Sequence, residues 1–186
     1  MTSLFGSGIK RREDPRLITG AGNFVDDIKL VGLTYAAVLR SPYAHAKIAR
    51  IDTSAAASAP GVIAIFTGKD LAGKVNPVPC AWNVPNADIK IPAHPLLAAD
   101  RVRYVGDGVA LVIAESRAAA RDAVDLIAVD LDPLPAVVDP EAATKEGAPQ
   151  LHDGVARNIG FTWKVAGGDA AAAFASAPVS VSLKIV

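Results

Sequence analysis

The sequence predicts an α+β protein with mixed sheets, a strand–helix–strand core and a long proline-rich loop. Residues 109–114 (VALVIA) are apolar at every position, which is typical of a strand covered on both faces. Ser116 is placed to cap a helix over 117–128, because its hydroxyl can accept from an unpaired N–H of the first turn. Residues 128–132 then alternate apolar and acidic side chains, as in a strand with one buried face. The buried stripe of the helix is predicted to contain Ala120, Ala123, Val124 and Ile127.

Residues outside this core carry weaker patterns. Residues 1–16 lack any periodicity, which predicts an extended arm. Gly20, Gly22 and the pair Asp26-Asp27 then mark turns around short extended pieces. The segments with strand-like patterns are 33–39, 46–51, 62–66, 179–186 and, as a weaker candidate, 159–165.

Short helices are predicted from their capping residues. Thr53 or Ser54 is expected to cap a single alanine turn. Thr67 and Asp70 have the spacing of a capping box. Asp169 is expected to cap a short alanine-rich helix that ends before a proline.

Repeated prolines distinguish residues 73–95. Proline has no N–H to donate to a strand ladder, so no regular element is expected there. A loop longer than about 15 residues in a compact domain is usually functional or ordered by a partner, and Trp82 favours docking over disorder. The prolines are Pro77, Pro79, Pro85, Pro92 and Pro95.

Length, charge and cysteine content exclude several classes of function. A chain of 186 residues can form one ordinary core without a disulfide or a metal. Lys plus Arg and Asp plus Glu each number 19, so no overall field favours nucleic acid or an anionic membrane. One cysteine excludes an internal disulfide and a CxxC metal or iron–sulfur site. Without a signal-peptide pattern or an apolar run of roughly 20 residues, we expect a cytoplasmic protein with neither nucleic acid nor membrane as partner.

The histidines and the cysteine are dispersed. His45, His94 and His152 have no paired spacing, so local hydrogen bonds or surface positions are expected in preference to a metal site. His45 is a candidate to orient the turn at Arg40-Ser41-Pro42. Cys80 lies among prolines without a neighbouring histidine, which favours an ordinary thiol over a nucleophile.

The remaining candidates also have structural explanations. Gly106-Asp107-Gly108 precedes a strand, whereas a dinucleotide-binding loop links a strand to a helix, so a turn is expected. Glu13-Asp14 and Asp26-Asp27 are expected to form turns and ion pairs with Arg11, Arg12 or Arg16. Lys10-Arg11-Arg12 is too short for a nucleic-acid groove. We therefore assign no catalytic, cofactor-binding or metal-ligating residue to this chain.

Several sequence blocks together resemble a known family. They are RREDPRLITGAGNFVDDI, LRSPYAHAKIARIDTSAAASAPGVIAIFTGKDL, HPLLAADRVRYVGDGVALVIAES, DLDPLPAVVDPEAA and GGDAAAAFASA, in this order. They resemble the N-terminal part of the large subunit of molybdenum hydroxylases, the family of xanthine dehydrogenase, aldehyde oxidase and aerobic carbon monoxide dehydrogenase. The resemblance runs from about Arg11 to Val186. One departure is Gly108, where the family usually has proline, and a loosened loop is expected there.

The resemblance implies an α/β-hammerhead domain that precedes the molybdopterin-binding domains. It divides the chain into an N-terminal arm with turns (1–32), the hammerhead domain (33–145) and an incomplete start of the following molybdopterin-binding region (146–186). Molybdopterin and the catalytic residues would lie in the rest of the large subunit, and the 2Fe-2S clusters and FAD on an iron–sulfur subunit and an FAD subunit. This chain would be structural in a complex that hydroxylates an aldehyde or a purine-like N-heterocycle, or oxidises carbon monoxide.

Other hypotheses stay open. Residues 179–186 keep a strand pattern to the last residue, which predicts either a fragment of a longer chain or a subunit whose last strand pairs with another polypeptide. A stand-alone, non-catalytic interaction or assembly module is the alternative, with that strand and the proline-rich loop as its partner surfaces. An independent enzymatic activity is the weakest hypothesis, because no residue pattern supports it.

Overall fold

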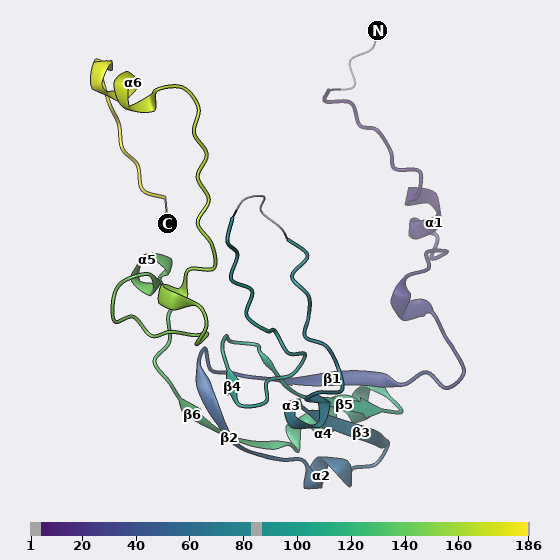
Figure 1. The fold of residues 1–186 in the computed structure, drawn as a ribbon. Coiled ribbons are helices and arrows are strands. Elements are labelled where there is room, and N and C mark those ends of the chain that lie inside the picture. Colours follow the sequence, from purple (N-terminus) through teal and green to yellow (C-terminus); the bar gives the residue numbers. More distant parts are fainter. Residues whose placement is uncertain (1–4, 83–86, 186) are drawn as a thin grey trace.

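The computed structural model of the chain describes residues 5–82 and 87–185 (Figure 1). In its first sheet, β5 (Gly108–Ala114) pairs antiparallel with β1 (Tyr35–Arg40) and with β3 (Val62–Thr67). The residues of β5 are buried or half-buried, as a strand that is apolar throughout requires. The predicted doubly covered strand is confirmed, and it lies at the centre of this sheet.

The second sheet places β2 (Ala46–Asp52) between β4 (Arg101–Val102) and β6 (Ala128–Pro133), again with antiparallel pairing. No sequence pattern predicts β4, because 2 residues are too few for a periodicity. The two strands of the predicted strand–helix–strand unit, β5 and β6, belong to different sheets. The core therefore spans both sheets, and the side chains that pack against both of its buried clusters are Leu39, Ile51 and Val129.

The helix of the central unit, α4 (Arg117–Asp125), packs against β1 and β5. Ser116 caps it as predicted, because its Oγ accepts a hydrogen bond from the Ala119 N–H at 3.1 Å. The helix ends at Asp125 and not at 128, since the chain turns there to enter β6. The predicted apolar stripe is confirmed by the burial of Ala120, Ala123, Val124 and Ile127.

The first two short helices of the core begin differently. At α2 (Ser54–Ala57), the Thr53 side chain forms no capping hydrogen bond. Instead, Asp52 Oδ1 accepts hydrogen bonds from the Ser54 main-chain N–H at 3.0 Å and from the Ser54 hydroxyl at 2.7 Å. The predicted Thr53 or Ser54 cap is therefore wrong, because a neighbouring carboxylate binds the free donors first. These bonds lower the pKa of Asp52 below its ordinary value.

The capping box of α3 (Gly68–Leu71) forms as predicted. Asp70 Oδ2 accepts from the Thr67 N–H at 2.8 Å and from the Thr67 hydroxyl at 2.7 Å, which lowers the pKa of Asp70. Gly68 lies against the main chain of the next segment, so that a Cβ there would be 2.4 Å from the Ala98 carbonyl oxygen. A side chain at this position would push the two segments apart.

The N-terminal flank extends away from both sheets (Figure 1) and contains α1 (Asp14–Ile18) and η1 (Val25–Asp27). The prediction of an extended arm over 1–16 is wrong from Asp14 onward, because Pro15 in the first turn favours the start of a helix. Residues 1–4 of that arm lie outside the described part of the chain.

The C-terminal flank contains α5 (Pro140–Ala143), η2 (Ala156–Asn158) and α6 (Ala170–Ser176). The predicted Asp169 cap of α6 is confirmed, because its Oδ1 accepts from the Ala172 N–H at 2.9 Å. The predicted strands at 159–165 and 179–185 are wrong, since neither segment pairs with a strand among the described residues; Val186 lies outside them. No helix in the described part is long and apolar enough to cross a membrane.

Candidate functional site

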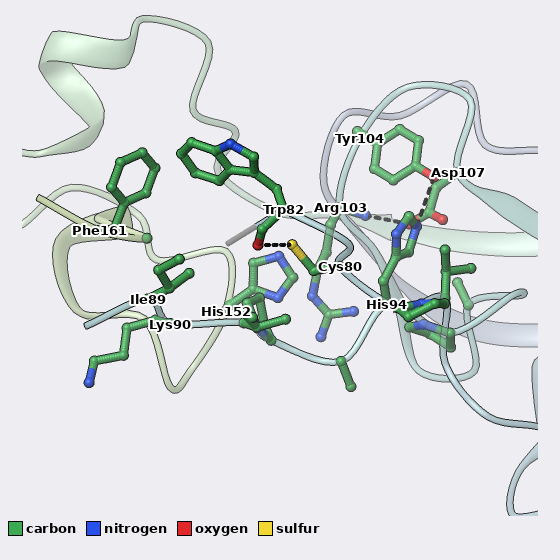
Figure 2. Close-up of a pocket in the computed structure, with 18 residues that line it drawn as sticks. Cys80, Trp82, Ile89, Lys90, His94, Arg103, Tyr104, Asp107, His152 and Phe161 are labelled. Atoms are coloured by element: carbon green, nitrogen blue, oxygen red, sulfur yellow. Dashed lines mark hydrogen bonds between the residues drawn. The ribbon is translucent and has the colours of Figure 1, made fainter. Parts of the chain in front are cut away.

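A cavity of about 550 Å³ opens between the proline-rich segment, the turn before β5 and residues 152–161 (Figure 2). We call it the proline-loop groove. Most of its lining is apolar, and charged or hydrogen-bonding side chains are few. The lining residues are Val78, Pro79, Cys80, Trp82, Ile89, Lys90, Ile91, Pro92, Ala93, His94, Pro95, Ala98, Arg103, Tyr104, Asp107, His152, Gly160 and Phe161.

Main-chain hydrogen bonds hold the walls of the groove in place. The Val78 N–H donates to the His94 carbonyl at 2.8 Å and ties together the two arms of the proline-rich segment. The Lys90 N–H donates to the Gly160 carbonyl at 2.7 Å and ties the second arm to the C-terminal flank. Within 73–82 and 87–95 the segment forms no strand and no helix, as its prolines predict.

Two aromatic rings close one end of the groove. Trp82 and Phe161 meet edge to face, with ring centroids 4.7 Å apart and planes at 67°. The prediction that Trp82 docks is confirmed. Cys80 is exposed beside it and donates to the Trp82 carbonyl oxygen at a sulfur–oxygen distance of 3.6 Å.

Arg103 supplies a partly buried cation at the other end. Its Nε donates to the Leu151 carbonyl oxygen at 3.1 Å and its Nη1 to the Arg101 carbonyl oxygen at 3.4 Å. Asp107, which is only 8% exposed, accepts from the Arg103 main-chain N–H at 3.0 Å through Oδ2. Within 5–82 and 87–185, the Arg103 guanidinium forms no ion pair with a carboxylate.

Tyr104 and His94 line the groove near Asp107. The Tyr104 hydroxyl is 3.4 Å from His94 Nε2, and the two rings meet edge to face (Figure 2). Partial burial raises the pKa of Tyr104, and the charge of Asp107 raises it further. The hydroxyl therefore stays protonated and able to donate at neutral pH.

His152 reaches the groove from the C-terminal flank. Burial lowers the pKa of its imidazole below the ordinary value, and the nearby Arg103 guanidinium and His94 ring lower it further, while Asp153 acts in the opposite direction. His152 is consequently neutral at neutral pH and offers one ring N–H donor. Protonation would place a further positive charge next to Arg103.

His45 lies elsewhere, in the turn between β1 and β2. Its side chain is buried, and its Nδ1 is 2.9 Å from the Pro135 carbonyl oxygen, so Nδ1 carries the proton. Its Nε2 is buried without a hydrogen-bond partner in the described structure. His45 does not orient the preceding turn, which is held by Ser41, whose Oγ accepts from the Tyr43 N–H at 3.0 Å.

Gly106-Asp107-Gly108 forms a turn, as predicted. Gly106 has φ +92°, a conformation that favours glycine, and its carbonyl oxygen accepts from Arg40 Nη1 at 2.8 Å. Gly108 is the first residue of β5 and is buried, so the expected loosened loop is wrong. The Leu97 side chain lies 3.2 Å from the position that a Cβ on Gly108 would take.

The paired acidic residues act structurally. Glu13 pairs with Arg16 at 2.8 Å and Asp14 with Arg11 at 3.0 Å, which confirms the expected ion pairs. Asp27 Oδ2 accepts from the Phe24 N–H at 2.9 Å. Asp26 pairs with Arg117 at 3.2 Å and not with Arg11, Arg12 or Arg16 as predicted, because the fold brings η1 to the start of α4. Among the described residues, no group of 3 or more His, Cys, Asp or Glu side chains could hold a metal ion.

The groove was only partly visible in the sequence. The proline pattern and Trp82 identify one wall, but Arg103 and His152 carry no motif, and the chain brings them together only through the fold. The sequence signal that could have identified Arg103 is its position between Val102 and Tyr104, at the end of a short strand and the start of the following turn. A charged side chain between apolar residues is informative because charged residues are seldom buried unless they are paired.

The fold and sequence can be compared with known proteins. The family described as "Aldehyde oxidase and xanthine dehydrogenase, a/b hammerhead domain" matches residues 19–135. The chain belongs to this family. The solved aldehyde oxidoreductase from Desulfovibrio gigas superposes with a TM-score of 0.78 at 35% identity, over 92% of this chain and 19% of that one.

Two curated hammerhead-containing relatives extend the comparison. The nicotine 6-hydroxylase large subunit of Paenarthrobacter nicotinovorans is 39% identical over 180 residues, which is 97% of this chain and 22% of that protein. The carbon monoxide dehydrogenase large chain of Hydrogenophaga pseudoflava is 40% identical over 185 residues, 92% of this chain and 22% of that one. The chain thus spans less than a quarter of the length of these relatives.

Proposed function

We propose that this chain is the hammerhead portion of the large subunit of a molybdenum hydroxylase and serves a structural role within the complex. The supporting observation is that 97% of the chain aligns with a single portion, 22%, of the nicotine 6-hydroxylase large subunit. Within this proposal, residues 33–145 are the hammerhead domain, 1–32 precede it as an arm, and 146–186 begin the next, molybdopterin-binding region; the family match over 19–135 supports the central part of this division.

The complex as a whole is proposed to be a cytoplasmic oxidoreductase. Relatives are named as acting on nicotine, carbon monoxide, xanthine or aldehydes, so the substrate is an N-heterocycle, an aldehyde or carbon monoxide. Molybdopterin in the rest of the large subunit would supply the redox chemistry, with 2Fe-2S clusters and FAD on partner subunits. Among the described residues no group of three or more His, Cys, Asp or Glu side chains could hold a metal ion, and we derive no catalytic step from this chain.

The contribution of this chain's own residues is a rigid scaffold with exposed apolar surfaces. The two sheets and α4 pack around two buried clusters that share Leu39, Ile51 and Val129. Exposed apolar side chains on both flanks offer area for burial against other domains. They include Phe24, Val25, Val31, Val179, Val181, Leu183 and Ile185.

Purification of the tagged chain from native extract tests the proposal. We expect recovery with subunits that contain molybdenum and iron, measured by elemental analysis of the purified complex. A matched pair of variants provides the control: Ala123→Asp, at a fully buried position, should abolish recovery of these metals, and Ala118→Asp, on the exposed face of α4, should not. A stable monomer without molybdenum or iron partners would favour the stand-alone assembly module, which the unpaired, exposed residues 179–185 also suit.

A further inference from the structure

The proline-loop groove has an unusual charge arrangement for an apolar cavity. The Arg103 guanidinium is partly buried and donates only to main-chain carbonyl oxygens within the described part of the chain. The second cation of the lining, Lys90, is neutralised by Asp88 at 2.6 Å. The buried carboxylate of the lining, Asp107, is bonded to the main-chain N–H of Arg103 and leaves the guanidinium without an anionic partner.

A neutral imidazole lies next to this guanidinium. His152 lies close enough to Arg103 for the cation to disfavour protonation of the imidazole. A partly buried guanidinium with a neutral imidazole beside it is complementary to a carboxylate, because arginine binds planar carboxylates through paired donors.

The remainder of the groove suits an apolar group. Its walls consist of proline, valine and isoleucine side chains with Trp82 and Phe161 at one end. A volume of about 550 Å³ lies within the roughly 300–1,000 Å³ of small-molecule sites, which are usually mostly apolar with a few convergent polar groups.

We propose that the proline-loop groove binds a small organic acid, with its carboxylate on Arg103 and its aromatic or aliphatic body between the proline-rich walls and Trp82. The proposal does not rest on the chemistry proposed for the whole complex. If the groove does not bind an organic acid, the family assignment and the proposed scaffold role still hold, since those rest on sequence and fold alone.

Tryptophan fluorescence provides the direct test. The purified chain is titrated with 4-phenylbutanoate and, in parallel, with its neutral carboxamide. We expect saturable quenching by the acid and binding of the amide that is about tenfold weaker or more, the loss expected for one charge-assisted hydrogen bond. The signal should disappear in Trp82→Phe, which preserves the ring contact with Phe161. Quenching that persists in this variant would come from Trp163, outside the groove, and would overturn the proposal.

Arginine variants identify the anion-binding group. Arg103→Gln should bind acid and amide equally, whereas Arg103→Lys, which preserves the charge, should retain part of the preference for the acid. Arg121→Gln, on the exposed face of α4, makes the same charge change away from the groove and should bind like the unaltered chain. Circular dichroism confirms that each variant is folded. A preference for the acid that survives in folded Arg103→Gln would refute the assignment.

A pH titration gives a readout that a merely structural Arg103 would not change. A bound carboxylate favours the imidazolium, so it should raise the pKa of His152, followed by NMR of the imidazole ring. The acid should consequently bind more tightly as pH falls through the titration range of His152, and the amide should bind with no such dependence. Identical His152 titration curves with and without saturating acid would also contradict the proposal.

Discussion

Two apolar segments of the chain have strand-like sequences and opposite surroundings. Residues 109–114 form most of β5 and are buried or half-buried between two partner strands. Residues 179–185 alternate as cleanly, yet they pair with no strand in the described part of the chain. They run back from α6 toward α5, where Lys184 pairs with Glu141 at 2.7 Å (Figure 1). Their apolar side chains are exposed, with Val181 at 86%.

The two segments show that an apolar sequence pattern alone does not make a strand. An apolar pattern indicates which side chains would stabilise the fold if they were buried on one face of a strand. A strand also needs a neighbour, because its backbone N–H and C=O groups must be paired. β5 has neighbours on both edges within this chain, and 179–185 has none among the described residues. Substitutions in the two regions should therefore have very different effects.

The largest effect is expected in the packed region at Ala123, which is 0% exposed on the inner face of α4. Ala123→Asp buries an unpaired charge and should lower the free energy of unfolding by about 4 kcal/mol or prevent folding. Urea denaturation followed by circular dichroism measures the change. Ala118→Asp, on the exposed face, should stay within about 0.5 kcal/mol. Equal stability of the two variants would show that the helix is not oriented as described.

A smaller loss is expected at Gly68, where the main chain of α3 touches the segment before β4. Gly68→Ala places a Cβ 2.4 Å from the Ala98 carbonyl oxygen, a contact that requires the backbone to move. We expect a loss of about 1–3 kcal/mol in unfolding free energy, as for other overpacked sites. Gly167→Ala, where no atom lies within 4 Å of the new Cβ, serves as the control and should change little. A neutral Gly68→Ala would mean that these segments are not in contact.

Loss of the α4 cap should cost less. Ser116→Ala removes the acceptor for the Ala119 N–H and should lower the free energy of unfolding by about 1 kcal/mol. Ser116→Asp keeps an acceptor at the helix N-terminus and should restore most of the loss. The thermal midpoints of the two variants measure the difference, and a Ser116→Asp midpoint as low as that of Ser116→Ala would argue against capping.

The smallest effect is expected in the exposed segment. Val181→Ser should change the free energy of unfolding of this chain by less than about 0.5 kcal/mol, because the side chain is exposed. Val112→Ser, at a fully buried position of β5, is the matched comparison and should be clearly destabilising. Similar losses in the two variants would remove the contrast between the regions. If Val181 becomes buried when partner subunits are present, hydrogen exchange of 179–185 should slow in the complex.

Elements with a local signal were predictable. The period of α4, the Ser116 and Asp169 caps and the apolar run of β5 all depend on residues close in sequence, and the structure confirms them. The Thr53 cap failed because a competing acceptor, Asp52, lies one residue earlier. In the groove, the proline-rich wall was predictable, and Arg103 and His152 were not, since the fold joins them across a long stretch of chain.

The sequence by itself determined the family, the α+β class and which faces of the central helix and strands are buried. These follow from the order of the sequence blocks and from periodicities that depend on neighbouring residues. Only the tertiary structure decided that β5 and β6 belong to different sheets, that 179–185 finds no partner strand among the described residues, and that Arg103, His94 and His152 share one groove. Pairing and convergence of this kind involve residues far apart in the chain, and no local pattern encodes which distant segments meet.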